Sequence, residues 1–351
     1  MIHGADIWTY GDENLIDFSS NINPLGYPEG LREFLFSQFD NVKRYPDIKY
    51  RLLKDNLSKY LKISSKNIIA GNGAMELIDL IISRYENIII PYPSFVEYEI
   101  RANIRKINMN LIPPKKDLSL DIERILKEIR RLKDKNGSII IGNPNNPNGY
   151  AIDYSHLTDI HSACMESEVD LILDEAFFEY AELDYDTVEY AESKEFKNII
   201  IIRAATKFFA LPGLRLGYSV MQSGLAKIIE DQMNPWSINS FADSASSYIF
   251  KDEDYIKKSI SFNRMERNYL ISELNKFGIF RVYDSKSNFI LLKMENSNRK
   301  LFEFLLKNNL LIRLCQNFRG LDDRYIRIAV KSRIYNDRLL KLLHDYVNLK
   351  S

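Results

Sequence analysis

The stretch KNIIIIRAATKFFALPGLRLGY, residues 197–218, starts with a run of four isoleucines and continues into a polar and basic loop. The apolar run is too short for a typical helix, and its composition is typical of a strand that is buried on both faces of a parallel sheet. Lys207 follows this run, and Arg215 comes eight residues later, beyond a Pro-Gly pair. By itself Lys207 would be a solvated residue after a buried strand, so its role depends on the rest of the chain.

Three earlier runs have the same form. They cover residues 87–93 (NIIIPYP), 137–147 (GSIIIGNPNNP) and 169–180 (VDLILDEAFFEY), and helix-like segments at 121–135 and 153–168 lie between them. Strands that alternate with helices predict a doubly wound α/β domain with a mainly parallel sheet, which we place over residues 31–250. In such sheets, ligands bind at the loops beyond the carboxyl ends of the strands.

The pattern changes after about residue 250. Residues 255–278 have the period of a long amphipathic helix, and short strand-like and helical segments follow it to the end of the chain. This α+β pattern predicts a second, smaller domain over residues 251–351. Residues 1–30 are expected to form an N-terminal arm that contributes to the smaller domain and to the ligand site.

Composition limits the classes of partner. The 351 residues include 48 basic and 48 acidic side chains, and this zero net charge argues against nucleic acid or an anionic membrane as the main partner. The chain has no apolar run of the ~18 residues that a membrane span needs and no basic-then-apolar leader, so we expect a cytoplasmic protein. The two cysteines, Cys164 and Cys315, lack the spacing of metal ligands, so they are expected to be reduced and no metal is expected.

Three further motifs lie where the predicted strands end. GNGAMELI (71–78) places two glycines before a helix-like run, which would suit a phosphate at a helix N-terminus but would also suit a plain turn. NPNNPNG (143–149) could present an amide side chain or be a loop without a role. Asp174 follows the apolar run of LILDEAF (171–177), where a carboxylate needs a partner; a helix cap or an ion pair would also satisfy it.

These loops, in this order and with Lys207 after the fourth run, resemble those of the fold-type I pyridoxal-phosphate enzymes along nearly the whole chain. The resemblance implies that Lys207 forms the Schiff base with the cofactor aldehyde and that Asp174 keeps the pyridine nitrogen protonated. It further implies that Asn146 hydrogen-bonds the 3-oxygen of the ring. Phe95 would stack on the ring face, although it could also be a core aromatic. The residues implied around the phosphate are Gly73, Ala74, Met75, Thr206, Arg215 and Tyr45. Tyr45 would come from the neighbouring subunit, which implies a homodimer.

One position departs from the family pattern. The family usually has Ser three residues before the lysine, whereas this chain has Ala204. A phosphate contact is therefore missing, and we expect cofactor affinity to be lower by about 1 kcal/mol unless another group replaces it.

Two groups within the family share these loops, the histidinol-phosphate aminotransferases and the L-threonine-O-3-phosphate decarboxylases. The chain is more similar to the decarboxylases in HGADIW (3–8), IDFSSNINPLG (16–26), NPWSINSFADSA (234–245), which contains Trp236, and the segment 310–333. Phe177 stands where the aminotransferases typically carry Tyr. The resemblance implies decarboxylation of threonine phosphate to aminopropanol phosphate, a building block of the cobalamin nucleotide loop.

The resemblance also implies the substrate residues. Arg313 and Arg327 would bind the carboxylate and phosphate of a phospho-amino acid, although either alone could form a surface ion pair, and His3 and Asn21 would close the phosphate end. Histidinol-phosphate aminotransferase remains the alternative enzyme. A non-catalytic interaction protein with the same fold is a further alternative, which the intact Lys207, Asp174 and Arg215 disfavour.

Overall fold

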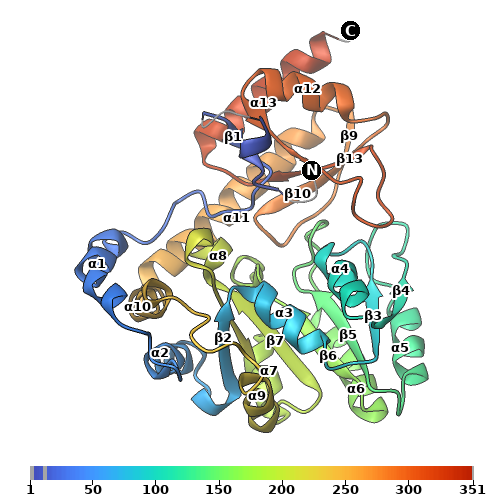
Figure 1. Cartoon of the computed structure of the whole chain (residues 1–351). Helices are drawn as coiled ribbons and strands as arrows, with labels where there is room; N and C mark the ends of the chain where they lie inside the picture. The colour runs from blue at the N-terminus through green and yellow to red at the C-terminus, as the bar shows by residue number, and fades with distance from the viewer. Residues whose placement is uncertain (1–3, 11–13, 350–351) are drawn as a thin grey trace.

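The computed structural model describes residues 4–10 and 14–349. The described chain forms a larger and a smaller part, which lie one above the other in Figure 1 and are each built on their own sheet.

A seven-stranded mixed sheet forms the centre of the larger part. Neighbouring strands within the group β3 to β7 run parallel, whereas β8 is antiparallel to both β7 and β2. The order across the sheet is β2-β8-β7-β6-β5-β3-β4, with bounds β2 Ile68–Asn72, β3 Asn87–Pro91, β4 Asn108–Ile112, β5 Gly137–Gly142, β6 Asp170–Asp174, β7 Ile199–Ala204 and β8 Leu216–Val220. The predicted doubly wound, mainly parallel α/β fold is confirmed.

Helices cover both faces of this sheet. Ile200 and Ile202 of β7 belong to the core beneath α3 (Ala74–Ile82), α4 (Glu97–Ile104) and α9 (Ser223–Glu230), whereas Ile199 and Ile201 belong to the core on the opposite face. The second core is covered by α1 Leu31–Ser37, α2 Arg51–Leu61, α5 Ile122–Arg131, α6 Tyr154–Ser167, α7 Thr187–Ser193 and α10 Ser240–Ile249. Because both faces are buried, the central strands are continuous apolar runs rather than alternating ones.

The smaller part is built on a four-stranded antiparallel sheet of order β12-β13-β10-β9. Its elements are β9 Phe280–Val282, β10 Phe289–Met294, α12 Arg299–Lys307, β11 Leu310–Leu311, β12 Arg313–Leu314, β13 Tyr325–Ala329 and α13 Arg333–Asn348. The long helix α11 (Glu253–Asn275) joins the two parts, because Tyr255 packs into the core of the larger one and Leu270 into that of the smaller one.

The N-terminal segment packs against the smaller part. Strand β1 (Ile16–Asp17) pairs in parallel with β11. Phe18, which is fully buried, donates its N–H to Leu311 O at 2.7 Å and accepts from Ala329 N at 2.9 Å. These contacts support the division into residues 1–30, 31–250 and 251–351, which remains a proposal.

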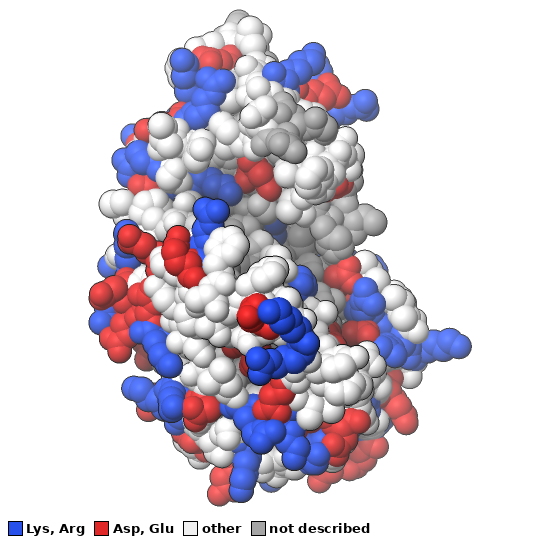
Figure 2. Space-filling model, turned by 60° about the vertical axis from the view of Figure 1, so that its left-hand side comes forward, with Lys and Arg blue, Asp and Glu red and all other residues white. Residues whose placement is uncertain are grey.

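The predicted helices at 121–135, 153–168 and 255–278 correspond to α5, α6 and α11 and differ from them only at their ends. The short helical elements are α8 Ala205–Phe208 and the 3-10 helices η1 Ile7–Tyr10, η2 Phe39–Lys43, η3 Ser65–Asn67, η4 Phe178–Tyr180 and η5 Pro212–Leu214. Within residues 4–10 and 14–349, each helix is too short or too polar to cross a membrane. Basic and acidic side chains are interspersed over the face shown in Figure 2, in keeping with the zero net charge.

Candidate active site

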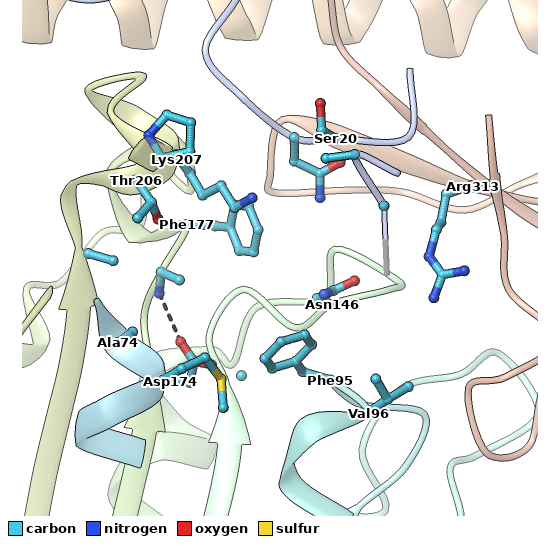
Figure 3. A pocket seen from close by; sticks show the side chains of 18 of the residues that line it. Ser20, Ala74, Phe95, Val96, Asn146, Asp174, Phe177, Thr206, Lys207 and Arg313 are labelled. Carbon is cyan, nitrogen blue, oxygen red and sulfur yellow. Dashed lines mark hydrogen bonds between the residues drawn. The ribbon is translucent and has the colours of Figure 1, made fainter. Parts of the chain in front are cut away.

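A cavity of about 260 Å³ lies where the carboxyl ends of β5, β6 and β7 face the smaller part. Lys207 and Arg313 enter it from opposite sides, with Asn146 and Phe95 between them (Figure 3). The predicted residues that line this cavity are Asn21, Ala74, Met75, Phe95, Asn146, Asp174, Phe177, Ala204, Thr206, Lys207, Arg215, Arg313 and Arg327. Residues that are spread over more than three hundred positions of the sequence are therefore brought to one pocket.

Lys207 lies in α8, the single helical turn that follows β7. Its backbone oxygen accepts hydrogen bonds from Asn23 N at 3.1 Å and from the Tyr180 hydroxyl at 3.4 Å, which fix the turn. Burial, together with the nearby charges of Arg327 and Arg215, lowers the pKa of the Lys207 amine to about 8. A lysine with such a pKa is partly neutral near physiological pH and can act as a nucleophile.

Asp174 is the last residue of β6 and is 7% exposed. The Tyr98 hydroxyl donates to Asp174 Oδ2 at 2.6 Å, and Ala176 N donates to Oδ1 at 3.1 Å. Burial raises the pKa of the Asp174 carboxyl, and these two hydrogen bonds oppose the rise because they favour the charged form. Asp174 is thus a buried carboxylate at a strand end that is held by donors, with no counter-ion in the described chain.

Tyr98 was not predicted from the sequence. It lies in α4, three residues after Phe95, and its ring packs edge-on against the Phe95 ring with centroids 5.7 Å apart. The spacing of three between the two aromatics, one just before α4 and one inside it, could have indicated that they share a face.

The N-terminus of α3 contributes Ala74 and Met75 to the pocket lining. Gly73, with φ 78°, caps the helix, and its own N–H donates to Gly71 O at 2.8 Å. Of the three amides predicted to bind the phosphate, those of Ala74 and Met75 therefore lie in the first turn of the helix, whereas that of Gly73 bonds within the loop. A Cβ on Gly73 would lie 2.5 Å from Arg215 Nη2, which shows how closely the guanidinium approaches the loop. Thr206 lines the pocket beside this region.

Ala204 ends β7 and contributes only a methyl group to the pocket wall. Asn146 accepts a hydrogen bond from Arg327 Nη1 through its Oδ1. Asn145, its neighbour, instead fixes the loop by donating to Pro93 O at 2.8 Å. The loop at residues 143–149 therefore presents one amide to the cavity and uses another for its own structure.

Arg313 and Arg327 lie directly opposite each other across the antiparallel pair β12 and β13. They are 2% and 5% exposed, and burial lowers the pKa of Arg327 to about 10. Arg327 also donates to Ser19 O at 3.0 Å, while Arg313 donates to Leu314 O at 2.6 Å and to Asn317 Oδ1 at 2.8 Å. Two buried arginines at opposed positions repel each other unless an anion lies between them.

The remaining predicted residues, Asn21, Tyr45 and His3, do not all lie in the pocket of the described chain. Asn21 lines the pocket, and its Oδ1 is buried without a hydrogen-bond partner in the described chain. Tyr45 is 77% exposed, packs on Trp236 with ring centroids 4.6 Å apart, and does not line the pocket of its own chain. His3 lies outside the described residues.

A lysine after one strand, a carboxylate at the end of another and an anion site at a helix N-terminus define the class of pyridoxal-phosphate-dependent enzymes with this sheet fold. Residues 13–343 match the model of the family described as aminotransferase class I and II, and the chain belongs to this family.

Among similar proteins, one from Caldanaerobacter subterraneus named "Putative threonine-phosphate decarboxylase" is 38% identical over 97% of this chain and 92% of its own. Threonine-phosphate decarboxylase from Salmonella typhimurium is 31% identical over 97% and 93% of the two chains. The solved structure of histidinol-phosphate aminotransferase from Clostridium acetobutylicum is 39% identical, with a TM-score of 0.89 over 94% of this chain and 98% of that one. The fold and the predicted family are confirmed.

The pocket fits pyridoxal phosphate. Lys207 suits its aldehyde, Asp174 its pyridine nitrogen and Phe95 its ring face, while Arg215 and the first turn of α3 suit its phosphate. Gly217 allows the first turn of α3 to reach the phosphate, because a Cβ at this position would lie 2.4 Å from Ala74 N and would push the N-terminus of α3 out of place.

Proposed function

We propose that the protein decarboxylates L-threonine O-3-phosphate to (R)-1-aminopropan-2-ol phosphate and CO2, a step of cobalamin biosynthesis. The opposed pair Arg313 and Arg327 carries this proposal, because the substrate has two anionic groups and the pair offers two buried guanidinium groups on one wall. The names of the relatives from Caldanaerobacter and Salmonella support the same reaction.

Lys207 would hold the cofactor covalently, Asp174 its ring nitrogen, Asn146 its 3-oxygen, and Thr206, Arg215, Ala74 and Met75 its phosphate. When bound, pyridoxal phosphate supplies an electron sink for the bond that breaks at the α-carbon of an amino acid. Phe95 and Phe177 line the pocket and keep water from the reacting carbon.

The protein residues then decide which bond breaks. The arginine pair orients the carboxylate and the phosphate, so that the bond between the α-carbon and the carboxylate is the one aligned for cleavage. CO2 leaves, and one proton must replace it at the α-carbon. Lys207 would supply that proton once the amino group of the substrate has displaced it from the cofactor, because a pKa of about 8 lets its ammonium form release a proton near neutral pH.

Histidinol-phosphate aminotransferase is the second candidate, favoured by the 39% identity to the Clostridium structure. Phe177 is the residue that argues against it: its ring packs edge-on against Phe289 with centroids 5.1 Å apart, and it has no hydroxyl to offer the 3-oxygen.

One experiment separates the two. The purified protein with added cofactor is given L-threonine O-3-phosphate without a keto acid, and histidinol phosphate with 2-oxoglutarate, while CO2 and glutamate are measured. We expect CO2 from the first mixture and negligible glutamate from the second. Glutamate formation without CO2 would assign the aminotransferase activity instead.

We also propose a homodimer in which Tyr45 reaches the neighbouring subunit's site. Its exposure, together with that of Phe36, Phe39 and Trp236, supports an apolar contact surface there. Mixing an inactive Tyr45→Ala variant with inactive Lys207→Ala protein should restore some activity in hybrid dimers. A lack of recovery despite subunit exchange would place Tyr45 outside the partner's site.

A cytoplasmic location is proposed as well, and the two free, buried cysteines are in keeping with it.

A further inference from the structure

The loop between β12 and β13 reaches from the smaller part toward α4 of the larger part (Figure 1). Arg319 in this loop forms a two-pronged ion pair with Glu99 of α4: Nε lies 3.0 Å and 2.8 Å from the two carboxylate oxygens, and Nη2 lies 2.7 Å from Oε2. The side chains of Arg319 and Glu99 are 49% and 18% exposed. The ion pair therefore fastens the two parts of the molecule to each other at the surface beside the pocket.

Gly320 brings the same loop close to the larger part. Its φ of +79° is a left-handed conformation that favours glycine, and a Cβ there would lie 2.9 Å from the Tyr92 ring. The loop backbone is thus pressed against the segment that leads into α4.

Asn317 and Phe318, the two residues before Arg319, contact Arg313. Asn317 Oδ1 accepts from Arg313 Nη2 at 2.8 Å, and the Arg313 guanidinium carbon lies 5.3 Å from the centre of the Phe318 ring. Phe318 is 2% exposed and lines the pocket together with Val96, which directly precedes α4 and lies on the same side of the pocket as Arg313 in Figure 3. Residues 317–318 therefore hold Arg313, and residues 319–320 hold the loop to the larger part.

We propose that Glu99 and Arg319 are positioning residues that lock this loop across the two parts and thereby set the Arg313 guanidinium for the substrate's anionic group. The proposal rests on the proposed function, since it takes Arg313 as a substrate residue. Neither Glu99 nor Arg319 lines the cavity itself. Their effect must therefore appear in substrate binding rather than in the chemistry at Lys207.

The test uses the holoenzyme with Glu99→Gln, Arg319→Gln and the double exchange Glu99→Arg with Arg319→Glu. Asp322→Asn is the matched control, because Asp322 pairs at 2.5 Å with Arg324 of the same loop. The side chains of Asp322 and Arg324 are 46% and 41% exposed, and this surface ion pair does not connect the two parts of the molecule. Each single variant should raise KM for L-threonine O-3-phosphate about 3- to 5-fold with kcat unchanged, as expected for an exposed ion pair. The double exchange should restore KM, and the control should not change it.

Two further measurements do not depend on turnover. Amide hydrogen exchange of residues 316–321 should become faster in the single variants and return to normal in the double exchange. Binding of inorganic phosphate to the holoenzyme, measured by calorimetry, should weaken by the same factor as KM rises. If the wild type fails to decarboxylate phosphothreonine, the proposed function is lost, while exchange and phosphate binding still decide the role of the ion pair.

Unchanged phosphate binding and KM in the single variants would overturn the proposal, even if the loop exchanged faster, because Arg313 would then be held without the ion pair. An equal effect of Asp322→Asn would also overturn it.

Discussion

Tyr98 donates a hydrogen bond to Asp174 at 2.6 Å while its ring packs edge-on against Phe95. One side chain in α4 therefore fixes both the carboxylate proposed for the ring nitrogen of the cofactor and the aromatic proposed for the ring face. Because burial alone raises the pKa of Asp174, the Tyr98 hydroxyl helps to keep this carboxyl ionised.

Replacing Tyr98 with Phe should move the pH profile of activity. The variant loses a hydrogen bond to the charged form of Asp174, so the pKa of Asp174 rises further. Activity that needs the carboxylate is lost as pH falls through that pKa, so the acidic limb of kcat against pH should shift to higher pH by about 1 unit.

Tyr85→Phe is the matched control, because the Tyr85 hydroxyl donates to Asp170 Oδ2 at 2.6 Å, and neither residue lines the pocket. The same acidic limb in wild type and Tyr98→Phe would contradict the role assigned to Tyr98.

The lowered pKa of Lys207 predicts how the apoprotein takes up cofactor. Only the neutral amine attacks the aldehyde, so the rate of covalent attachment should rise with pH and level off above about 8, where an ordinary lysine would still be protonated. The measurement is the visible absorbance of the lysine-bound cofactor after mixing, and Lys207→Ala should show none of it while keeping its fold. A midpoint near the ordinary lysine pKa of about 10.4 would show that burial does not act on this amine.

The parts of the structure that were predicted from the sequence share one property. Strand β7 is a run of isoleucines, and Lys207 and Asp174 each follow such a run, so local composition and the rule for parallel sheets place them together. The resemblance to a family then supplied Asn146, Phe95 and Arg215.

What the sequence did not predict depends on contacts between distant segments. Tyr98 and Asp174 are 76 positions apart, and Glu99 and Arg319 are 220 apart, so no local period relates them. Arg313 and Arg327 were predicted together as substrate residues, but their direct opposition depends on the register of β12 and β13.

Gly217 should be needed for cofactor binding although it touches no catalytic group. An Ala side chain there would lie 2.4 Å from the backbone nitrogen of Ala74, so α3 must move away from the phosphate end. Gly217→Ala should destabilise the fold by about 1–3 kcal/mol and weaken cofactor affinity, measured by denaturant unfolding and by titration.

Gly224→Ala provides the comparison, because a Cβ at Gly224, within α9, meets only Gln222 Oε1 at 3.7 Å. That variant should be neutral or slightly stabilising, since Ala favours a helix over Gly. Normal cofactor affinity in Gly217→Ala would show that the N-terminus of α3 does not hold the phosphate.

The opposed arginines should lower the stability of the ligand-free fold but contribute to substrate binding. Arg327 is buried and forms no ion pair within the described chain, so Arg327→Met removes a buried charge that has no ion-pair partner and also removes the repulsion from Arg313. Without ligand, the melting temperature of Arg327→Met should therefore stay the same or rise, whereas kcat/KM for L-threonine O-3-phosphate should fall by the equivalent of about 2–4 kcal/mol. Arg324→Met, which removes an exposed ion pair just before β13, should leave kcat/KM within a factor of about 2. If Arg327→Met instead lowered the melting temperature and kept near-normal kcat/KM, Arg327 would be a structural residue, and the two-anion site would have to be sought elsewhere in the pocket.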